Sequence, residues 1–425
     1  MLIELLVTPA DNIPYPEFYI MGNQIESFGS LNAGGHSSVT LRRFYSEQSW
    51  IDGEALRQLE EMLRLEGAKA LAAFPDLHPG KYGATGVALH SHRLHPLLIG
   101  NDIGCGMALF ALDLPLRKLR IDKAEQRLRE LEHQQVGDPV KALTAHGLPH
   151  DLFPEALGTI GGGNHFCELQ AVDRVFRSSS EQLINDQCLY LLVHSGSRGV
   201  GAAVLAEFLA TNEKSNAGFE IDDPFAARWM AMHDQCVAWA MLNRRLIAER
   251  AARALRADIT LIADVPHNLV QRLPEGIVHH KGAAAVESGD LVPIAGSRAS
   301  LSYIVRVREE VQQALGAISH GAGRKYDRAS MHGRVGSSRS HREQLARNDW
   351  GGRAICDDRS LLIEEAASAY KDCSQVVTDL EEHQLVERVA AMRPLVTYKT
   401  AVNRPGNSRA TSDRLNKRGK RHEKR

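Results

Sequence analysis

The sequence lacks the segments that would direct a protein into or across a membrane. Its 425 residues contain no run of about 18 apolar residues, so a membrane span is excluded. The first residues, MLIELLVTPADNIPYPEF, have no basic region, and their apolar stretch breaks at Asp11. We therefore expect no signal peptide.

A disulfide framework and the common nucleotide-binding motifs are also missing. The six cysteines are irregularly spaced, and none forms a CxxC pair. This usage is typical of a reducing compartment such as the cytoplasm, where each thiol is either buried or a metal ligand. The sequence contains neither a P-loop motif nor a GxGxxG between a strand and a helix, which argues against P-loop and Rossmann nucleotide sites.

The charge is nearly balanced overall but unevenly distributed. The formal net charge is −1, with 43% hydrophobic and 24% charged residues, the usual proportions of a globular protein. The last 22 residues, from Arg404 to Arg425, carry a net charge of +7, and the rest of the chain carries −8. Such a basic tail is typical either of a solvated arm that binds a polyanion or of a disordered terminus without a partner.

The pattern of apolar residues predicts a mixed architecture. Helical and β-type segments alternate without a regular βαβ rhythm, which favours the α+β class over a doubly wound sheet. We expect one large domain of β-sheets with surrounding helices over residues 1–403 and a disordered tail over 404–425. Helices are expected at 54–67, 122–136, 225–257 and 359–392, and strands at 97–100, 107–112, 188–193, 259–263 and 302–307.

Glycine-rich segments with polar side chains adjoin almost every predicted strand. Examples are GNDIGCGM (100–107), GTIGGGNHFCE (158–168), HSGSRGVG (194–201) and SHGAGR (319–324). Glycine lets backbone N–H groups approach an anion and adopts positive φ angles at little cost. The sequence therefore predicts a pocket built from loops at the ends of strands.

Five side chains in or beside such loops have the chemistry of metal ligands. Asp102 and Cys105 lie three residues apart, and they can hold one metal ion, or two if the sulfur bridges. His165, His194 and His267 lie in a Gly-rich loop or at the end of an apolar strand. Taken singly, each could instead be a buried thiol, a capping Asp or a structural His. Together they predict a metal site, and the residue types leave Zn²⁺, Fe²⁺, Co²⁺ and Mn²⁺ open.

His320 in SHGAGR has a different setting. A neutral imidazole flanked by glycine, with Arg324 four residues later, suits a nucleophile that attacks a phosphate. A buried His in a tight turn is the alternative. Arg198, Lys281 and Ser297 add further donors for anions.

These segments together resemble the RtcB family of RNA-splicing ligases. The matching motifs follow the family's order over about residues 70–400, and DIGCGM, HSGSRG and HGAGR are the most specific of them. The motifs are FPDLHPGKYGATG (74–86), DIGCGM (102–107), GGNHFCE (162–168), VHSGSRGVG (193–201), PHN (266–268), HHKGA (279–283), GSRASLS (296–302), SHGAGR (319–324), EEAASAYKD (364–372) and PLVTYK (394–399).

The resemblance implies an RtcB-like fold and a GTP-dependent RNA ligase with a dinuclear metal site. It implies that His320 attacks the α-phosphate of GTP to form a histidyl–GMP intermediate, and that Arg198 and Arg324 lie near the phosphates. Two Mn²⁺ ions would be held by Asp102, Cys105, His165, His194 and His267, with the Cys105 thiolate bridging them. The guanylate would be held by Asn164, Phe166, Glu168, Ser297, Ser302, Gly321, Ala322, Gly323, Tyr370 and Lys399.

The resemblance also implies the substrates. The enzyme would transfer GMP to an RNA 3′-phosphate, and an RNA 5′-hydroxyl would then displace GMP to seal the strand. A 2′,3′-cyclic phosphate end would first be hydrolysed at the same site. Such a ligase would act as a cytoplasmic monomer in RNA repair or tRNA splicing. The alternatives are a metal-dependent RNA-end phosphoesterase that does not ligate, and a catalytically weak protein that binds RNA ends.

The sequence departs from the family pattern in three places. Arg298 and Ala299 stand where the family has Met and Gly, and His280 stands where it has Arg. Residues 325–328, which include Tyr326, differ from the Met-Ser-Arg that tends to follow HGAGR. We expect these changes to border the nucleotide and RNA phosphates and to affect substrate preference more than the chemistry.

Truncation after Asn403 should weaken RNA binding, mainly at low salt, without changing the chemistry. Each phosphate that the basic tail neutralises should contribute roughly −0.7 to the slope of log affinity against log salt for a single strand. Affinity measured over a salt series checks this prediction. Guanylylation of His320 without RNA is the control. If truncation lowers the guanylylation of His320, the tail instead closes the guanine pocket beside Lys399.

Overall fold

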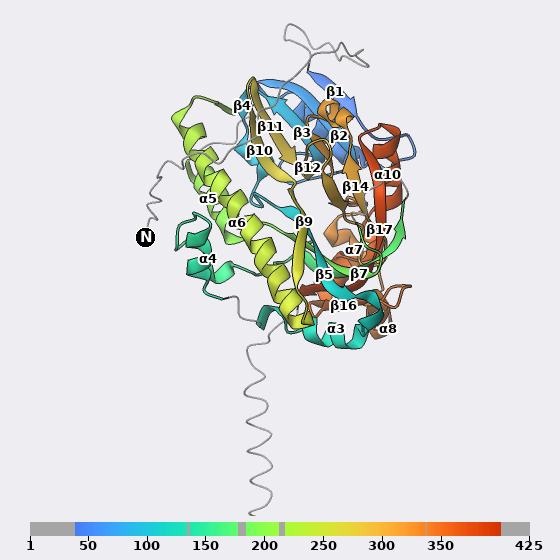
Figure 1. Ribbon diagram of the computed structural model, residues 1–425. Helices are drawn as coiled ribbons and strands as arrows, with labels where there is room; N and C mark the ends of the chain where they lie inside the picture. Colours follow the sequence, from blue (N-terminus) through green and yellow to red (C-terminus); the bar gives the residue numbers. More distant parts are fainter. Residues whose placement is uncertain (1–38, 134–136, 177–183, 212–216, 337, 401–425) are drawn as a thin grey trace, which may run out of the picture.

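A curled sheet of eight strands lies at the centre of the computed structural model, which describes residues 39–133, 137–176, 184–211, 217–336 and 338–400 (Figure 1). Seven strands follow in the order β13-β14-β17-β6-β7-β5-β9, and β16 pairs with β17 outside this path. The end strands β13 and β9 contact each other, so the sheet closes nearly into a barrel. The strands are β5 (Gly106–Pro115), β6 (Phe166–Val175), β7 (Cys188–Ser195), β9 (Ile259–Pro266), β13 (Leu291–Ile294), β14 (Ser302–Val307), β16 (Arg353–Cys356) and β17 (Val386–Thr400).

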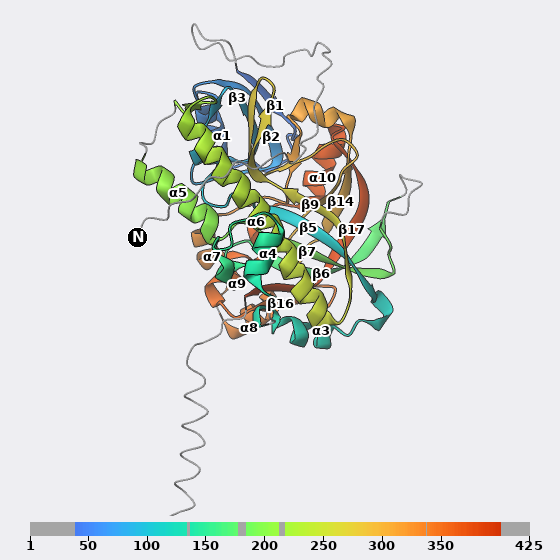
Figure 2. The ribbon, with the colours of Figure 1, turned by 60° about the vertical axis from the view of Figure 1, so that its left-hand side comes forward.

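Side chains alternate between the two faces of this sheet, and both faces are buried. On the outer face, Leu191 of β7 and Leu169 of β6 pack against the long helix α6 (Pro224–Leu255), which crosses the strands (Figure 2). On the inner face, Leu192 of β7 packs with Leu109 of β5. Burial on both sides explains the continuous apolar run CLYLLV at 188–193, which lacks the usual alternation of a half-exposed strand.

A second sheet of five strands lies above the barrel in Figure 1, in the order β1-β2-β3-β11-β10. Two small antiparallel pairs, β12–β15 and β4–β8, complete the strands that the structure describes. These strands are β1 (Thr40–Arg43), β2 (Ala68–His78), β3 (Thr85–Ser91), β4 (Arg93–Leu94), β8 (Phe219–Glu220), β10 (Asn268–Leu273), β11 (Gly276–Lys281), β12 (Ala283–Ala285) and β15 (Ala317–Ser319).

Helix α6 shows how local sequence sets the ends of an element. The Asp223 side chain accepts a hydrogen bond from the Phe225 amide, and Pro224 occupies the first turn, where its missing N–H costs nothing. The helix ends at Arg256, which adopts the left-handed conformation with a φ of 62°. The other α-helices are α1 (Gly53–Met62), α2 (Pro96–Ile99), α3 (Ile121–Leu128), α4 (Pro139–Ala145), α5 (Gly199–Thr211), α7 (Arg328–Arg334), α8 (Arg339–Leu345), α9 (Arg359–Glu364) and α10 (Cys373–Glu382).

The mixed α+β class predicted from the sequence is confirmed. The strands expected at 107–112, 188–193, 259–263 and 302–307 lie within β5, β7, β9 and β14. The helix expected at 225–257 is α6 within two residues at its end. The helix expected at 54–67 is α1, which is capped by Asp52 but ends earlier, at Met62. The predicted tail over 404–425 lies outside the described residues.

Three expected elements are wrong in type or extent. Residues 97–100 lie in α2 and its cap rather than in a strand, because Pro96 starts a helical turn and Gly100 ends it with a φ of 74°. The region 359–392 contains α9 and α10 but then turns at Gln384 into β17, where pairing with β14 and β6 decides the conformation. Helix α3 ends at Leu128, well before the expected end, and residues 134–136 are not described.

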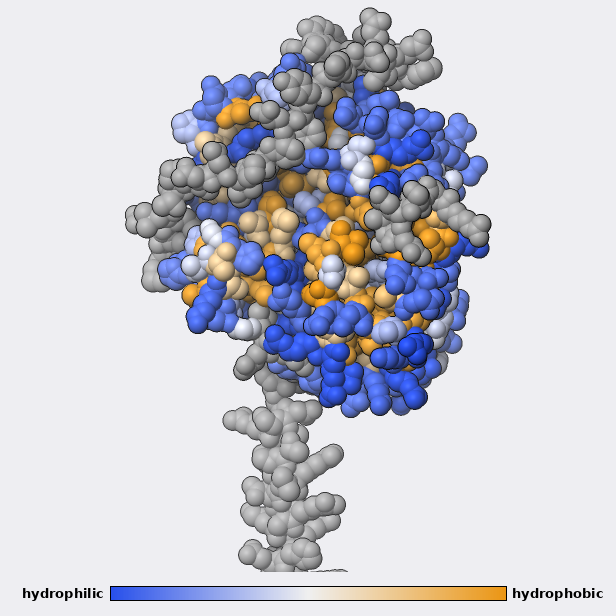
Figure 3. Space-filling model, viewed as in Figure 1, coloured by the Kyte–Doolittle hydropathy of each residue, from blue (hydrophilic) through white to orange (hydrophobic). Residues whose placement is uncertain are grey.

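Apolar side chains gather near the middle of the face seen in Figure 3, in the region of β9, while hydrophilic side chains cover most of the remainder. Leu261 of β9 is 55% exposed, which reflects the edge at which the barrel stays incompletely closed. Among the helices that the structure describes, none combines the length and the apolar character needed to cross a membrane.

A buried arginine ties the barrel to α6 and to the loop before β5. Arg244 of α6 is fully buried, and its Nε lies 2.7 Å from Oδ1 of Asp264 in β9. Its Nη1 donates to the carbonyl oxygens of Gly104 at 2.7 Å and Ser195 at 2.9 Å. One side chain therefore fixes the ends of β5, β7 and β9 relative to one another.

Arg244→Met should lower the free energy of unfolding by about 3–5 kcal/mol, because it leaves the Asp264 carboxylate buried without its partner. Arg245→Met is the matched control, since Arg245 is the next residue of α6 and its side chain is exposed. The control should change stability by about 0.5 kcal/mol or less. Urea unfolding of both variants measures the difference, and equal stabilities would contradict the assigned role of Arg244.

Candidate active site

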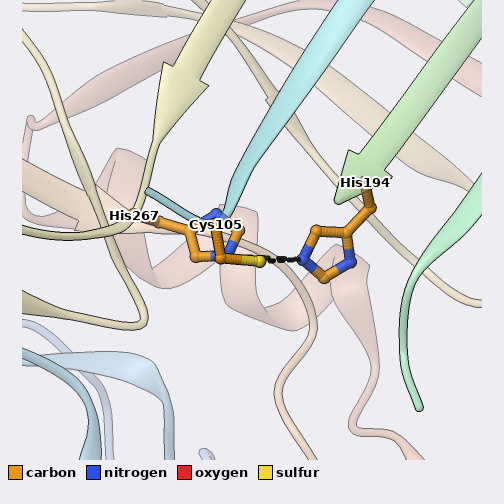
Figure 4. Close-up of side chains that lie close together, drawn as sticks. All are labelled: Cys105, His194 and His267. Carbon is orange, nitrogen blue, oxygen red and sulfur yellow. Dashed lines mark hydrogen bonds between the residues drawn. The ribbon is translucent and has the colours of Figure 1, made fainter. Parts of the chain in front are cut away.

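Three neighbouring strands bring Cys105, His194 and His267 to one end of the barrel (Figure 4). Cys105 immediately precedes β5, His194 lies near the end of β7, and His267 immediately follows β9. In the pairing register, Met107 of β5 faces His194, and Gly106 faces Pro266. The register therefore places side chains from distant parts of the chain next to one another.

The side-chain atoms of these residues and two further ones converge within contact distance. The Cys105 Sγ lies 3.1 Å from Nε2 of His194 and 3.3 Å from Nε2 of His165. The His194 and His267 Nε2 atoms are 3.3 Å apart, and His165 Nε2 lies 3.0 Å from Oδ2 of Asp102. Two ligand sets result, Cys105 with His194 and His267, and Cys105 with Asp102 and His165. All five metal ligands predicted from the sequence thus lie together, and the thiol belongs to both sets.

The electrostatics of the cluster fit a cation. Burial, together with neighbouring imidazoles, holds the pKa of His194 and His267 well below the usual value, so both rings are neutral and have a lone pair available. Burial opposes ionisation of Asp102, but the charge and hydrogen bond of His165 lower the pKa of this carboxyl below its usual range. Imidazole, carboxylate and thiol donors within this spacing are typical of transition-metal sites.

His320 follows β15 and lies beside this cluster. Its ring centroid is 4.5 Å from that of His267, and its Nδ1 lies 2.7 Å from Oδ2 of Asp76 in β2. The His320 backbone N–H also donates to the same carboxylate oxygen at 3.2 Å. The contact with the Asp76 carboxylate favours a proton on Nδ1, and an imidazole protonated there has its lone pair on Nε2.

Asp76 is a functional candidate that sequence reasoning missed, although it lies within the quoted segment FPDLHPGKYGATG. It is fully buried, and hydrogen bonds and charges from His320 and His78 lower its pKa against the opposing effect of burial. Lys371 Nζ donates to the carbonyl oxygens of Pro75 and Leu77, on either side of Asp76. The only available signal was a carboxylate inside an otherwise apolar strand.

A cavity of about 320 Å³ opens next to His320 and His194. Its wall includes Arg324 and every residue that the family resemblance assigned to the guanylate. Those ten residues are Asn164, Phe166, Glu168, Ser297, Ser302, Gly321, Ala322, Gly323, Tyr370 and Lys399. Sheet alternation explains much of this arrangement, because Phe166 pairs with His194 and Glu168 pairs with Thr397, so their side chains share the inner face.

Glu168 lies buried in the wall of the cavity within a polar network. Gln170 Nε2 donates to Glu168 Oε1 at 2.7 Å, and the Thr397 hydroxyl donates to Oε2. Burial raises the pKa of Glu168 to about 7, although Thr397, Gln170 and Lys399 oppose the shift. A fixed, buried carboxyl of this kind can accept hydrogen bonds from the N–H groups of a base. Sequence reasoning missed Gln170 and Thr397.

The opposite wall of the cavity is cationic. The buried Glu365 carboxylate is surrounded by three cations. Its oxygens lie 3.1 Å from Arg324 Nη1, 3.3 Å from Arg328 Nε and 3.6 Å from Lys399 Nζ. The Tyr370 hydroxyl also donates a hydrogen bond to this carboxylate. Burial would raise the pKa of Glu365, but Lys399, Tyr370 and the arginines lower it to about 2. Three cations around one carboxylate leave a net positive charge, which suits a bound phosphate. Glu365 was also missed, whereas Arg328 lies in the segment 325–328 that was expected to border the phosphates.

Arg198 lies in the turn between β7 and α5, next to the Gly-rich loop before β6. Its backbone is left-handed, with a φ of 55°, and its Nε donates to Thr159 Oγ1 at 3.3 Å. A Cβ at Gly161 would lie 1.9 Å from Nη1 of Arg198, so this close packing requires glycine. Burial lowers the pKa of Arg198, which the charge of Asp102 partly offsets.

Two of the departures from the family pattern, Arg298 and His280, occupy different places. Arg298 borders the cavity, but its guanidinium donates to the backbone carbonyls of Leu345, Leu362 and Glu365. His280 is buried in β11 and its Nε2 lies 2.8 Å from Gln271 Oε1, so the expectation that it borders the phosphates is wrong. Its side chain lies beside Gln271 of the neighbouring strand β10 of the five-stranded sheet.

A metal-ligand cluster, a histidine in contact with a carboxylate and a cationic cavity side by side are typical of an enzyme that acts on phosphate esters. A family model described as "tRNA-splicing ligase RtcB" matches residues 150–400. The RNA-splicing ligase RtcB2 of Escherichia coli is 37% identical over 368 residues, which cover 85% of this chain and 96% of that protein. The chain therefore belongs to the RtcB family of RNA-splicing ligases.

More distant relatives have the same family name. The tRNA-splicing ligase RtcB of Methanococcus maripaludis is 28% identical over 320 residues, which cover 64% of each chain. The tRNA-splicing ligase RtcB of Methanocaldococcus jannaschii is 28% identical over 290 residues, which cover 57% of this chain and 29% of that protein.

Cys105→Ala should lose more bound metal than His165→Ala or His267→Ala, because Cys105 belongs to both ligand sets. Cys167→Ala is the matched control, since Cys167 is a fully buried thiol in β6 outside both sets. Elemental analysis of the purified proteins measures metal content. A Cys105→Ala variant that retains as much metal as the Cys167→Ala control would show that Cys105 is only a buried thiol.

Proposed function

We propose that this RtcB-family ligase uses GTP to join an RNA 3′-phosphate or 2′,3′-cyclic phosphate end to a 5′-hydroxyl end. The observation that carries the proposal is the position of His320, held by Asp76 between the metal-ligand cluster and the cationic cavity. The alternative of a phosphoesterase needs the metal site but not an oriented nucleophilic histidine. Family membership supports ligation over hydrolysis alone.

The cavity suggests how a guanine nucleotide would bind. Ionised Glu168 would accept hydrogen bonds from the N–H groups of guanine, while Gln170 and Thr397 fix its carboxylate. Phe166 offers a ring beside the base, with Lys399 Nζ 5.9 Å from its centroid. Asn164, Ser297, Ser302, Gly321, Ala322, Gly323 and Tyr370 would complete the contacts around the nucleotide.

The first chemical step would form a bond between His320 and the nucleotide. His320 Nε2 attacks the α-phosphorus of GTP, a P–N bond forms, and the bond to the bridging oxygen breaks as pyrophosphate leaves. The Asp76 carboxylate holds the Nδ1 proton and stabilises the positive charge that develops on the ring. Arg324 and the Gly321–Gly323 backbone would stabilise charge on the phosphate oxygens.

The later steps would transfer GMP to RNA and then release it. An oxygen of the RNA 3′-phosphate attacks the same phosphorus, and His320 leaves as a neutral imidazole. The 5′-hydroxyl of the second RNA then attacks the activated 3′-phosphate, and GMP departs. Arg198 and Arg328 would contribute cationic side chains for the RNA phosphates.

Two Mn²⁺ ions would be held by the five residues of the metal-ligand cluster, with Cys105 shared between the two ligand sets. These residues are Asp102, Cys105, His165, His194 and His267. Bound there, the ions would polarise phosphoryl oxygens and neutralise part of their charge. We further propose that residues 1–403 form one ligase domain that acts as a cytoplasmic monomer in RNA repair or tRNA splicing, with the basic segment 404–425 as an RNA-binding tail.

Incubation with Mn²⁺, GTP and RNA strands bearing 3′-phosphate and 5′-hydroxyl ends should yield a joined strand only when GTP is present. His320→Ala should abolish joining, because the variant lacks the side chain that is proposed to receive GMP. His332→Ala is the control, since His332 is a partly exposed residue of α7 that pairs with Glu364. Electrophoresis of labelled RNA measures the products. Loss of the 3′-phosphate without joining, and independent of GTP, would favour the phosphoesterase alternative.

A further inference from the structure

An aromatic and cationic cluster lies on the surface beside the cavity. Trp50, in the loop between β1 and α1, has its ring centroid 6.2 Å from that of Tyr326, at an interplanar angle of 61°. The Arg334 guanidinium carbon of α7 lies 3.8 Å from the Tyr326 ring centroid. Trp50 is 37% exposed, although a tryptophan usually buries its ring. We call Trp50, Tyr326 and Arg334 the Trp50 cluster.

Backbone and side-chain contacts connect the Trp50 cluster to the catalytic centre. Arg324, which lines the cavity, donates from Nε to the Tyr326 carbonyl at 3.0 Å. Asp327 and Arg328, directly after Tyr326, also line the cavity. On the other side, the Trp50 ring lies 5.9 Å from Nζ of Lys371, the residue that holds the strand around Asp76. The Trp50 cluster is therefore next to residues that line the cavity.

Two cations lie beside the Tyr326 ring of the Trp50 cluster. Within the described part of the chain, Arg334 makes no ion pair, and Lys325 lies 5.5 Å from the Tyr326 ring centroid. The two acids closest in sequence cap helices: Asp327 accepts from the Ser330 amide at 3.0 Å, and Asp52 accepts from the Glu54 amide at 2.8 Å. An exposed aromatic ring among unpaired cations matches the two parts of a single-stranded nucleic acid, its bases and its phosphates.

We propose that the Trp50 cluster binds the RNA strand whose 3′ end enters the cavity, and this proposal rests on the proposed function. Arg334 covers one face of Tyr326, so the exposed Trp50 ring is the surface on which a base stacks. Arg334, held against Tyr326, binds a backbone phosphate next to that base. Tyr326, in the segment 325–328 that departs from the family pattern, thereby contributes to recognition of RNA.

The proposal is tested with the full-length protein and a short single-stranded RNA that ends in a 3′-phosphate. Trp50→Ala should weaken binding about tenfold, as expected for the loss of one base–aromatic stack, and Trp50→Phe should retain most of the affinity. Arg334→Gln should reduce the salt slope of log affinity by about 0.7. Trp350→Ala is the matched control, because Trp350 is also 37% exposed but lies in the turn between α8 and β16.

An abasic position moved along the RNA locates the contact. At one position near the 3′ end, removal of the base should weaken binding to the wild-type protein about tenfold. The Trp50→Ala variant should bind this abasic RNA and the intact RNA equally well. Thermal unfolding and GMP attachment without RNA show whether the variant keeps its fold and its nucleotide site. Two results would overturn the proposal. One is equal RNA affinity for Trp50→Ala and Trp350→Ala. The other is that the losses of affinity caused by Trp50→Ala and by removal of a base add independently at every RNA position.

Failure of the proposed function would give a different result. If the wild-type protein binds the RNA through Trp50 but does not join strands with GTP, the Trp50 cluster stands and the ligation chemistry falls. If strands are joined normally while the Michaelis constant for RNA is unchanged in Trp50→Ala, the chemistry stands and the Trp50 cluster is not an RNA site.

Discussion

The contact between Asp76 and His320 is the interaction on which the rest of the site depends. It joins β2 of the five-stranded sheet to the loop after β15, two segments 244 residues apart in the chain. It also favours a proton on Nδ1 of the imidazole rather than on Nε2. The metal-ligand cluster, the cavity and the cationic wall all lie around the nitrogen that this contact leaves available. The packing of the two sheets is thus a chemical requirement as well as a structural one.

The barrel supplies the remaining geometry through its register. Cys105, His194 and His267 come from three adjacent strands whose pairing places their ends together, and Arg244 holds those ends in position. On the inner face, the same alternation aligns Phe166 and Glu168 with the cavity. A one-residue shift in the register of β6 would move Phe166 and Glu168 to the outer face.

The sequence alone predicted the parts of the site that are encoded locally. Gly-flanked ligands such as Cys105 and His165, and the HGAGR segment around His320, combine reactive side chains with the turns that present them. The α+β class was also predictable from the runs of apolar residues. Whether these side chains bind Mn²⁺ and GTP stays a prediction. Asp76, Thr397 and Glu365 were missed because their partners are distant in the chain and no local pattern marks them. The first part of β17, residues 386–392, was read as helix because pairing, rather than propensity, decides its conformation.

The central claim is that His320 forms a covalent bond to GMP, and peptide mapping tests it most directly. The full-length protein would be incubated with Mn²⁺ and α-labelled GTP in the absence of RNA, digested, and its labelled peptide identified by mass spectrometry. The account predicts one acid-labile GMP group, attached to the peptide that contains His320. A GMP group on another residue, or no adduct from protein that still joins RNA ends, would contradict it.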